Sequence, residues 1–340
     1  MTTTEGARHD FRLTVLNPGG RDPAQDFSSG IDAPNDREHA PVNFHGYAAC
    51  TRGAFHRNVR RAVAASQPVL LLLRGDFKAT QRALLELKQH GLPVVVSLKE
   101  TGLHQIARQL EDPKRAARFR DIVQAADGCL AATVEALSFY GTGRFIPTPY
   151  PVHDERWDFS RPFDQRRGIF VGTREWDVPS RQHLAALVLA LGLGEPVTVF
   201  DGNPRRCRKV LRALGLPEDL LRVIERRLSY REYLAKMAEH KIALQADQSA
   251  VPGQVAGDAL LCRMPCVGGD GAIDRLGFPE TCGFGRSLGE LKELATRLLR
   301  DAEFYSATVA ASQKTAGDQI GYATVAQQLA QFFADPAVSS

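Results

Sequence analysis

The stretch PVLLLLRGDFKATQRALLELKQHGLPVVVSL, residues 68–98, decides the fold class. It begins with an uninterrupted apolar run at 68–73 and ends with a β-branched run at 92–98, and both are typical of strands covered on two faces. Residues 78–90 between them have apolar residues at helical spacing, and Gly91 stands where a helix C-cap is expected. This order predicts two parallel strands joined by a helix.

The same alternation of short apolar runs and amphipathic segments continues on both sides of this stretch. In the first half it predicts further strands at residues 11–16, 128–131 and 144–147, and further helices at residues 51–65, 104–126 and 134–140. Residues 21–42 are rich in Asp, Pro, Ser and Gly without periodicity, which predicts a long loop of a kind that is often functional. Strands that alternate with helices in this way indicate a parallel sheet with helices on both faces.

A proline-rich segment separates the two halves. Residues 147–151 read Pro-Thr-Pro-Tyr-Pro, which restricts the backbone to extended conformations, and we expect a hinge at residues 148–166. The alternation then restarts, with strands predicted at residues 168–172, 196–200, 241–245 and 265–268 and helices at residues 180–191, 205–214, 217–227, 230–239, 253–262, 288–304 and 319–333. The length of 340 residues also suits two domains, at about 150 residues for each.

Composition and charge exclude several classes of protein. The chain is 44% hydrophobic and 24% charged, as in ordinary globular proteins, and its formal charge is only +4. No apolar run approaches the roughly 18 residues of a spanning helix, and residues 1–10 are polar, unlike a signal peptide. Six scattered cysteines fit reduced thiols better than a disulfide framework, so we expect a cytoplasmic location. No second pair follows the C-x3-C of Cys262 and Cys266, so we expect no metal site.

Ligands of open parallel sheets bind beyond the carboxyl ends of the strands, so the residues after each predicted strand are the candidates for a binding site. Polar and glycine residues recur at these positions. They are Gly19 and Gly20, Lys99 and Glu100, Gly172, Thr173 and Arg174, Gly202, Asp247, and Gly268 and Gly269. Each is also compatible with an ordinary turn, so the chemistry of the residues has to distinguish among them.

The second half of the chain resembles the nucleotide-sugar domain of GT-B glycosyltransferases, most closely those of glycosyltransferase family 4. The resemblance is carried by Ile169-Phe-Val-Gly172, by VTVFDG at 197–202, and by Gly253-Gln-Val-Ala-Gly-Asp-Ala259 followed by Met264-Pro-Cys-Val-Gly268. It covers residues 147–285 well, whereas over residues 11–146 it lies mainly in the topology. It implies an α/β chain of GT-B architecture, with two tandem doubly wound, Rossmann-like parallel-sheet domains that face a cleft.

The resemblance also implies domain boundaries and a reaction. Residues 1–150 are expected to form an acceptor domain, residues 151–317 a nucleotide-sugar donor domain, and residues 318–340 a helix that crosses back to the first domain. The implied enzyme is a hexosyltransferase-like glycosyltransferase of carbohydrate biosynthesis. It moves a sugar from a UDP- or GDP-type nucleotide sugar to an acceptor hydroxyl, with retention and without a metal. The nucleotide sugar is a co-substrate, and no cofactor is implied.

The donor-site residues of the family are matched only in part. Asp258 matches the second of two family acids, which binds the ribose hydroxyls, although it also fits an acid that complements a helix dipole. Ala250 replaces the first acid, which leaves retention or inversion open, and Asp247 is a candidate to take over part of its role. Arg174 and Arg181 correspond to the diphosphate-binding cations, unless they are solvated surface residues. The predicted donor site is completed by Gly172, Thr173, Gly202, Gly268 and Gly269.

Lys99 and Glu100 stand where related enzymes often have His-Asp at a strand end near the acceptor. Glu100 is a candidate to orient or deprotonate an acceptor hydroxyl, and Lys99 to stabilise phosphate charge; the alternative is a surface ion pair. Gly19 and Gly20 resemble the glycine loop that lets the acceptor approach the first strand. The candidate catalytic residues are therefore Lys99, Glu100 and Asp247.

Two basic segments, residues 205–212 and 222–227, remain outside this assignment. A solvated helix face explains most such segments, and an anionic acceptor, a membrane surface or DNA are the alternatives. No aromatic residues interleave with the cations, so we do not expect nucleic acid as a partner, and peripheral membrane contact stays open. The acceptor also stays open, as a glycan, lipid-linked glycan, protein or small molecule. A non-catalytic GT-B-like nucleotide-sugar-binding protein and a DNA-modifying glycosyltransferase are the alternative functions.

Overall fold

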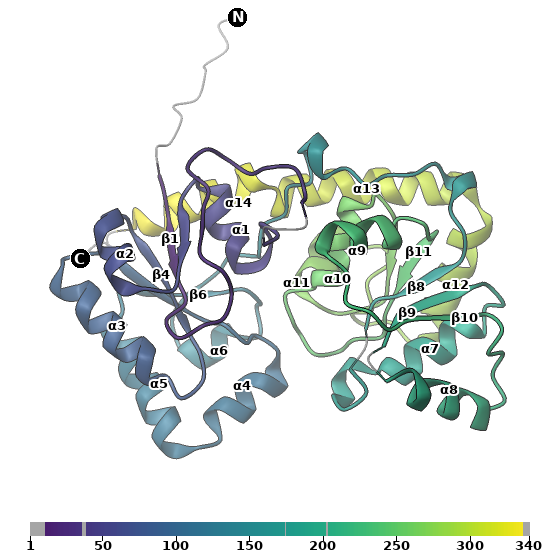
Figure 1. Ribbon diagram of the computed structural model, residues 1–340, viewed down its shortest axis with the longest axis horizontal. Helices are drawn as coiled ribbons and strands as arrows, with labels where there is room; N and C mark the ends of the chain where they lie inside the picture. Colours follow the sequence, from purple (N-terminus) through teal and green to yellow (C-terminus); the bar gives the residue numbers. More distant parts are fainter. Residues whose placement is uncertain (1–10, 36–38, 174, 202, 336–340) are drawn as a thin grey trace, which may run out of the picture.

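Two β-sheets, one in each half of the chain, organise the structure (Figure 1). The structure is a computed structural model that describes residues 11–35, 39–173, 175–201 and 203–335. In this part of the chain the first sheet has seven strands in the order β2-β3-β1-β4-β5-β6-β7, and the second has five in the order β10-β9-β8-β11-β12. All pairings are parallel except that of β2 with β3 at the edge of the first sheet.

The predicted strand–helix–strand unit forms the centre of the first sheet. Strands β4 (Val69–Leu73) and β5 (Val94–Leu98) pair over five residues each, and all ten residues are buried. The other strands of this sheet are β1 (Thr14–Leu16), β2 (Gln25–Asp26), β3 (Ala54–His56), β6 (Gly128–Ala131) and β7 (Arg144–Phe145). Its helices are α1 (Asn43–Cys50), α2 (Val59–Ala65), α3 (Lys78–Gln89), α4 (Leu103–Leu110), α5 (Pro113–Ala125) and α6 (Leu137–Tyr140).

The second sheet consists of β8 (Ile169–Val171), β9 (Val197–Phe200), β10 (Leu221–Ile224), β11 (Ile242–Leu244) and β12 (Cys266–Val267). Because parallel strands are joined by right-handed crossovers, α7 (His183–Leu191) and α8 (Pro204–Ala213) lie on one face of this sheet. Helix α12 (Leu288–Arg300) joins them there, since its buried residues Leu291, Ala295, Leu298 and Leu299 share their hydrophobic cluster. The opposite face is covered by α9 (Tyr230–Met237), α10 (Gln254–Leu261), α11 (Ala272–Gly277) and α13 (Ala302–Ile320). None of the described helices is long and apolar enough to cross a membrane.

Several predicted elements are wrong in detail. The helix predicted at 217–227 is instead the edge strand β10, which pairs with β9 over four residues. The helix predicted at 51–65 is strand β3 followed by α2, and α1 precedes both. The helix predicted at 104–126 is divided by Pro113, which starts α5 behind the N-cap Asp112. The strands β3 and β10 were missed because three or four residues carry too little periodicity to identify a strand.

The proline-rich segment and the residues after it form hydrogen bonds with both halves of the chain. Trp157 is buried and its indole N–H donates to the carbonyl of Asp32 at 2.9 Å, in the loop of the first half. The fully buried guanidinium of Arg166 donates to the carbonyls of His240 and Cys262 in the second half, at 3.3 and 2.7 Å. Trp157 thus ties this segment to the first half and Arg166 ties its end to the second, so the chain passes from one half to the other within residues 148–166, and the hinge there stays a prediction.

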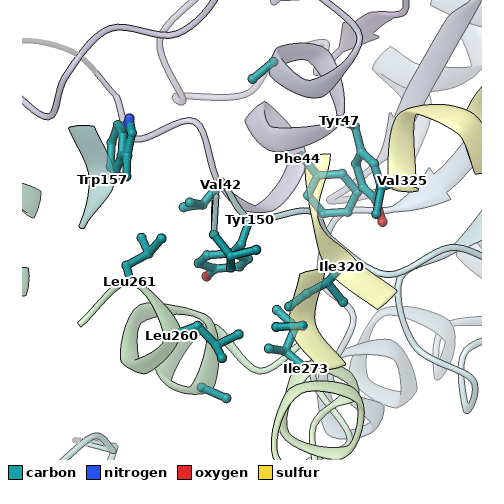
Figure 2. Close-up of a cluster of buried hydrophobic side chains, with 14 of the residues drawn as sticks. Val42, Phe44, Tyr47, Tyr150, Trp157, Leu260, Leu261, Ile273, Ile320 and Val325 are labelled. Atoms are coloured by element: carbon teal, nitrogen blue, oxygen red, sulfur yellow. The ribbon is translucent and has the colours of Figure 1, made fainter. Parts of the chain in front are cut away.

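Tyr150 lies at the centre of the junction between the two halves (Figure 2). Its backbone N–H donates to the carbonyl of Ile320 at 3.0 Å, and it forms a parallel bridge with Gly321, where α13 gives way to α14 (Tyr322–Phe333). Figure 2 shows its ring between Val42 of the first half and Leu260 of α10. The chain thus passes along the second half as α13 and returns to pack α14 against α1 of the first (Figure 1).

The close approach of Tyr150 to α10 yields a prediction for Gly257→Ala. A Cβ at Gly257 would overlap the ring of Tyr150, which is fully buried and has no room to move. We expect the substitution to cost about 1–3 kcal/mol in the free energy of unfolding, as overpacking does in other cores. Urea unfolding measures the change.

The matched control is Gly289→Ala in the first turn of α12, where the nearest atom to a new Cβ is 3.7 Å away. Since alanine is the better helix former, this variant is expected to be as stable as the original or more so. Equal stability of Gly257→Ala and the original chain would contradict the tight packing of Tyr150.

Candidate functional site

A cavity of about 250 Å³ lies between the two halves. One side is formed by residues that follow β5 or belong to α1 and α4, and the other by residues near Arg181 and the start of α10. Its lining consists of Asn43, Phe44, Lys99, Glu100, Thr101, Gln105 and Thr148 on the first side and Arg181, Val251, Pro252, Gly253 and Gln254 on the second. The cavity therefore contains Lys99 and Glu100, predicted from a strand end of the first sheet, and Arg181, which the family resemblance indicated in the second half.

Lys99 and Glu100 reach the cavity because β5 ends immediately before them at Leu98. The Lys99 ammonium lies 3.2 Å from the carboxylate of Asp22 and 5.1 Å from the ring centroid of Phe44. Partial burial would raise the pKa of Asp22, but the attraction of Lys99 outweighs it and lowers that pKa. Glu100 accepts a hydrogen bond from the Gln109 amide at 2.9 Å. Both side chains are thus oriented by neighbours and remain partly accessible.

Arg181 lies on the opposite side, at the end of a single 3-10 turn, Pro179–Arg181. Its Nε donates to Glu175 at 2.9 Å and its Nη1 donates to the buried carboxylate of Asp247. Asp247 in turn accepts from the backbone N–H of Ser249 at 2.8 Å. Arg181 and Asp247 therefore form one paired unit at the carboxyl edge of the second sheet.

Ser180 lies before the helix rather than at its start, because the helix predicted at 180–191 begins only at His183, behind Gln182 in a left-handed conformation. Its hydroxyl instead lies 2.8 Å from that of Ser249 and 3.4 Å from Nδ1 of His104, which α4 contributes from the first half. Partial burial and the nearby Arg181 lower the pKa of His104. His104, regarded from the sequence as an ordinary helix-face residue, thus stands beside Arg181.

The two halves also touch beside the cavity. The backbone N–H of Leu103 donates to the carbonyl of Ser249 at 3.2 Å, and the amide of Asn43 donates to Gln254 at 3.2 Å. Arg275 of α11 makes an ion pair of 2.7 Å with Glu135 of the first half. These contacts beside the cavity are polar, whereas the apolar contact between the halves lies around Tyr150.

Thr148, within the proline-rich segment, was not predicted as a site residue. Its side chain is buried, lines the cavity and has no hydrogen-bond partner for its hydroxyl among the described residues. A buried hydroxyl without a partner is costly unless a ligand or water completes it. The only sequence signal for Thr148 is its position after the last strand of the first sheet.

Asp258 lies behind the cavity rather than on its surface. It is 1% exposed, it accepts a hydrogen bond from the hydroxyl of Tyr230, and its second oxygen has no partner among the described residues. Burial raises its pKa to about 7, although hydrogen bonds from Tyr230, Tyr233 and other groups act in the opposite direction. In this conformation the carboxyl group is therefore closed off by tyrosines, and the ribose-binding role stays a prediction.

The predicted glycines are explained by close packing. Side chains at Gly172, Gly268 and Gly269 would overlap Val255, the carbonyl of Gln245 and Gln245 with Asp274, respectively. On the acceptor side Gly19 has a positive φ of 71°, and a Cβ at Gly20 would overlap the side chain of Asn17. The Asn17 amide donates to Asp22 at 3.1 Å, which connects this loop to Lys99.

The remaining predicted donor residues are placed less directly. Thr173 is buried, with its hydroxyl 3.3 Å from Nδ1 of His183, and it does not line the cavity. Arg174 and Gly202 lie outside the described residues. Ala250 has a positive φ of 48°, and its N–H donates to Asp270 at 3.2 Å. Asp270 thus approaches the position where the family has its first acid, which the sequence pattern did not indicate.

Two further observations concern metals and thiols. Among the described residues no group of three or more His, Cys, Asp or Glu side chains is arranged to hold a metal ion. All six cysteines are free thiols. Burial raises the pKa of Cys262 and Cys266, so these thiols stay protonated at neutral pH.

Comparison with known proteins was informative only at the level of structure. No protein-family model and no curated protein matches the chain. Sucrose-phosphate synthase from Thermosynechococcus elongatus superposes with a TM-score of 0.63 at 14% identity, over 97% of this chain and 100% of the other. HepE from Anabaena, in complex with UDP-glucose, superposes with a TM-score of 0.58 at 12% identity, over 95% of this chain and 99% of HepE. A UDP-forming trehalose-phosphate synthase from Burkholderia xenovorans superposes with a TM-score of 0.58 at 9% identity, over 96% of this chain and 99% of the synthase.

The chain has the GT-B fold. The predicted fold class, two tandem Rossmann-like parallel-sheet domains, is confirmed, and the similar structures are of glycosyltransferases with this fold. At identities of 14% or less the likeness concerns the fold, so the activity has to be argued from the residues of this chain.

The buried carboxyl of Asp258 predicts a pH dependence of stability. The unfolded carboxyl releases its proton near pH 3.8, whereas the folded one holds it up to about pH 7. Its stabilising contribution is therefore complete below about pH 4 and is lost as the pH rises toward 7. Asp258→Asn, which stays neutral, is expected to lack this loss and to be more stable than the original chain at pH 8, by up to roughly 1.4 kcal/mol for each unit of pKa shift.

Urea unfolding of both proteins at pH 5 and pH 8 measures the difference. The control is Asp219→Asn, at an exposed position, whose stability relative to the original chain should not change between the two pH values. A constant difference between Asp258→Asn and the original chain across the range would show that Asp258 is ionised throughout.

Proposed function

We propose that this protein is a glycosyltransferase that transfers a sugar from a nucleotide-sugar donor to an acceptor hydroxyl. The observation that carries the proposal is the cavity between the two sheets, where Lys99 and Glu100 of one half face Arg181 of the other. The GT-B fold supports it, since several similar structures are UDP-sugar-dependent enzymes by name or were solved with UDP or UDP-glucose. A UDP-type donor is therefore the first to test, with GDP-type donors second.

In this proposal the donor lies against the second half. Arg181 binds the diphosphate, because a guanidinium can donate two parallel hydrogen bonds to phosphate oxygens. Lys99, opposite, adds a second cation when the halves close on the donor. The residues 1–150 then bind the acceptor, residues 151–317 bind the donor, and the chain from residue 318 returns to the first half, in line with the packing of α14 against α1.

The transfer step is assigned to groups that line the cavity. The bond between the anomeric carbon and the diphosphate oxygen breaks, and a bond to the acceptor oxygen forms. The acceptor hydroxyl proton passes to Glu100, and the charge on the departing diphosphate is stabilised by Arg181 and Lys99. Independence from metal ions is part of the proposal because these two cations stabilise the diphosphate. Retention is proposed from the family resemblance alone, and it requires the acceptor oxygen to attack on the face that the diphosphate leaves.

The volume of the cavity bears on how the donor enters. About 250 Å³ is at or below the roughly 300–1,000 Å³ of typical ligand pockets, so we infer that the halves separate to admit a nucleotide sugar. Bending within residues 148–166 would open the contacts of Leu103 and Asn43 while Arg166 keeps its partners. Closure then excludes water and limits hydrolysis of the donor.

A non-catalytic nucleotide-sugar-binding protein is the second candidate. Ala250, in place of the first family acid, favours it, because a methyl group cannot contact the sugar as a carboxylate does. In that case the donor binds without turnover. The six free thiols fit a reducing compartment, so for either function we propose a cytoplasmic location.

Donor binding predicts a thermal shift that depends on Arg181. At 100 times its Kd a specific UDP-sugar stabilises the folded protein by about 2.7 kcal/mol, which raises the melting temperature measurably. A panel of UDP- and GDP-sugars is expected to contain at least one such ligand. Arg181→Gln should abolish the shift, while Arg300→Gln, at an exposed position on α12, should retain it. Retention of the full shift by Arg181→Gln would remove the diphosphate role from this residue.

Glu100→Gln separates catalysis from binding. We expect this variant to keep the thermal shift with the donor but to lower the rate of nucleotide release by about 100-fold or more, because it cannot accept the acceptor proton. Release of UDP or GDP in the presence of a panel of sugar, lipid-linked glycan and peptide acceptors is the measurement. Donor binding by the original chain without release for any acceptor would favour the non-catalytic candidate.

A further inference from the structure

One surface of the second half combines a cationic helix, α8, with the apolar helix α7 and the start of α12, where Glu290 and Glu293 are exposed, and it has no part in the proposed transfer. It is the outer side of α7 and α8 together with the start of α12, and we call it the basic face. Helix α8 reads Pro-Arg-Arg-Cys-Arg-Lys-Val-Leu-Arg-Ala from Pro204, with five cations and no acid in ten residues. Cys207 and Leu211 are buried against the sheet, so the cations take up the outer side.

Neighbouring acids compensate only part of this charge. Arg206 pairs with Asp177 at 2.9 Å and Arg212 pairs with Glu218 at 2.7 Å. Within the described residues no ion pair is formed by the other three cations, Arg205, Arg208 and Lys209. Three uncompensated charges within two turns of one helix create a strong local positive potential.

Exposed aliphatic side chains accompany these cations. Eight large apolar residues are exposed in the described part of the chain, and four of them lie on the basic face. These four are Leu184 and Val188 of α7, Leu214 at the end of α8 and Leu288 at the start of α12, with exposed fractions between 37% and 54%. Leu184 and Val188 are one helical turn apart, so they form a stripe on α7.

An open hollow joins the apolar and the cationic parts. It measures about 570 Å³ and is lined by α7, by Leu288 and by Trp176. The guanidinium of Arg206 lies 5.4 Å from the ring centroid of Trp176, which places the first turn of α8 at the rim of the hollow. Figure 1 shows α7 and α8 side by side on the same side of the second sheet.

We propose that the basic face binds an anionic lipid surface. Cations attract the headgroups of acidic phospholipids, and aliphatic side chains beside them insert at the boundary of the acyl chains. A nucleic acid would use the cations alone, and it would leave Leu184, Val188 and Leu288 exposed to water. A simple solvated face accounts for scattered charges but not for the exposure of Leu184, Val188 and Leu288 around one hollow.

The basic face lies at the same edge of the second sheet as the residues of the cleft. Helix α8 begins directly after β9, so its first turn lies at the carboxyl edge of the second sheet. Arg181 and Asp247 occupy the same edge. A membrane bound to the basic face therefore lies beside the entrance to the cleft, and the inference holds whether or not the site transfers sugar.

Sedimentation with vesicles tests the inference on the full chain. We expect binding to vesicles with about 30% phosphatidylglycerol in phosphatidylcholine at about 0.1 M salt, and little binding to phosphatidylcholine alone. Binding should fall steeply at about 0.5 M salt, where the Debye length is shorter than the distance between the charges and the headgroups. Equal binding to both kinds of vesicle, or no binding to either, would overturn the proposal.

Substitutions locate the binding on the basic face. The triple variant Arg205→Gln, Arg208→Gln, Lys209→Gln should bind anionic vesicles about a hundredfold more weakly, at about fivefold for each cation. The matched control is Arg57→Gln, Arg60→Gln, Arg61→Gln, which removes three exposed cations from the first half and should bind like the original chain. Leu184→Ser with Val188→Ser should weaken binding while it leaves the salt dependence unchanged.

Two further outcomes are decisive. Equal losses in the two triple variants would show that net charge, and not this face, is responsible. Tighter binding to a duplex DNA of about 20 base pairs than to anionic vesicles at the same salt concentration would replace the lipid surface by nucleic acid. Circular dichroism establishes that each variant is folded, and if the first triple variant is not, the lipid and salt series on the original chain still decides.

Discussion

The packing of Tyr150 is the constraint on which the rest of the structure depends. This residue is the last common point of the two halves: its backbone pairs with Ile320 and Gly321 as the chain returns, and its ring lies against Gly257 of α10. Glycine at position 257 is required because any side chain would occupy the volume of the ring. A single aromatic residue therefore couples the crossover between the domains to the helix that begins at the cavity.

That coupling determines the geometry of the site. Helix α10 begins after Gly253, which lines the cavity with a positive φ of 91° and lies against Asp274. If Tyr150 moves, α10 moves, and the distance between Gly253 and Lys99 across the cavity changes with it. The buried Asp258 belongs to the same helix. Tyr150, which packs between the halves, is also one of the tyrosines that influence the pKa of this carboxyl group. Motion of the halves and the electrostatics of this helix are consequently linked.

The sequence predicted the central strands and the candidate residues at their ends. It did not predict side-chain positions that depend on contacts between segments far apart in the chain. Strands β4 and β5 were predictable because continuous burial produces continuous apolar runs, whereas the exposed edge strand β10 resembled a helix. Lys99 and Glu100 could be expected at a ligand site because they follow a strand of a parallel sheet, and Arg181 because the family resemblance implied a diphosphate-binding cation there. The closure of Asp258 by Tyr230 could not, since that tyrosine lies 28 residues away on another helix. The same holds for His104, whose contact with Ser180 depends on how the halves meet, and for Asp22, which reaches Lys99 from a distant loop of the same half.

The ion pairs of Arg181 indicate which of its partners an anionic ligand would replace. Glu175 is 52% exposed, so its pair with Arg181 is screened by water and contributes at most about 1 kcal/mol. Asp247 is 5% exposed and also accepts the N–H of Ser249. If Arg181 moved away from Asp247, a buried carboxylate would be left without a cation. A diphosphate bound as proposed would therefore exchange with Glu175, while Asp247 would keep the guanidinium oriented toward the cavity. In this arrangement Asp247 acts on the donor through Arg181 rather than by contact with the sugar.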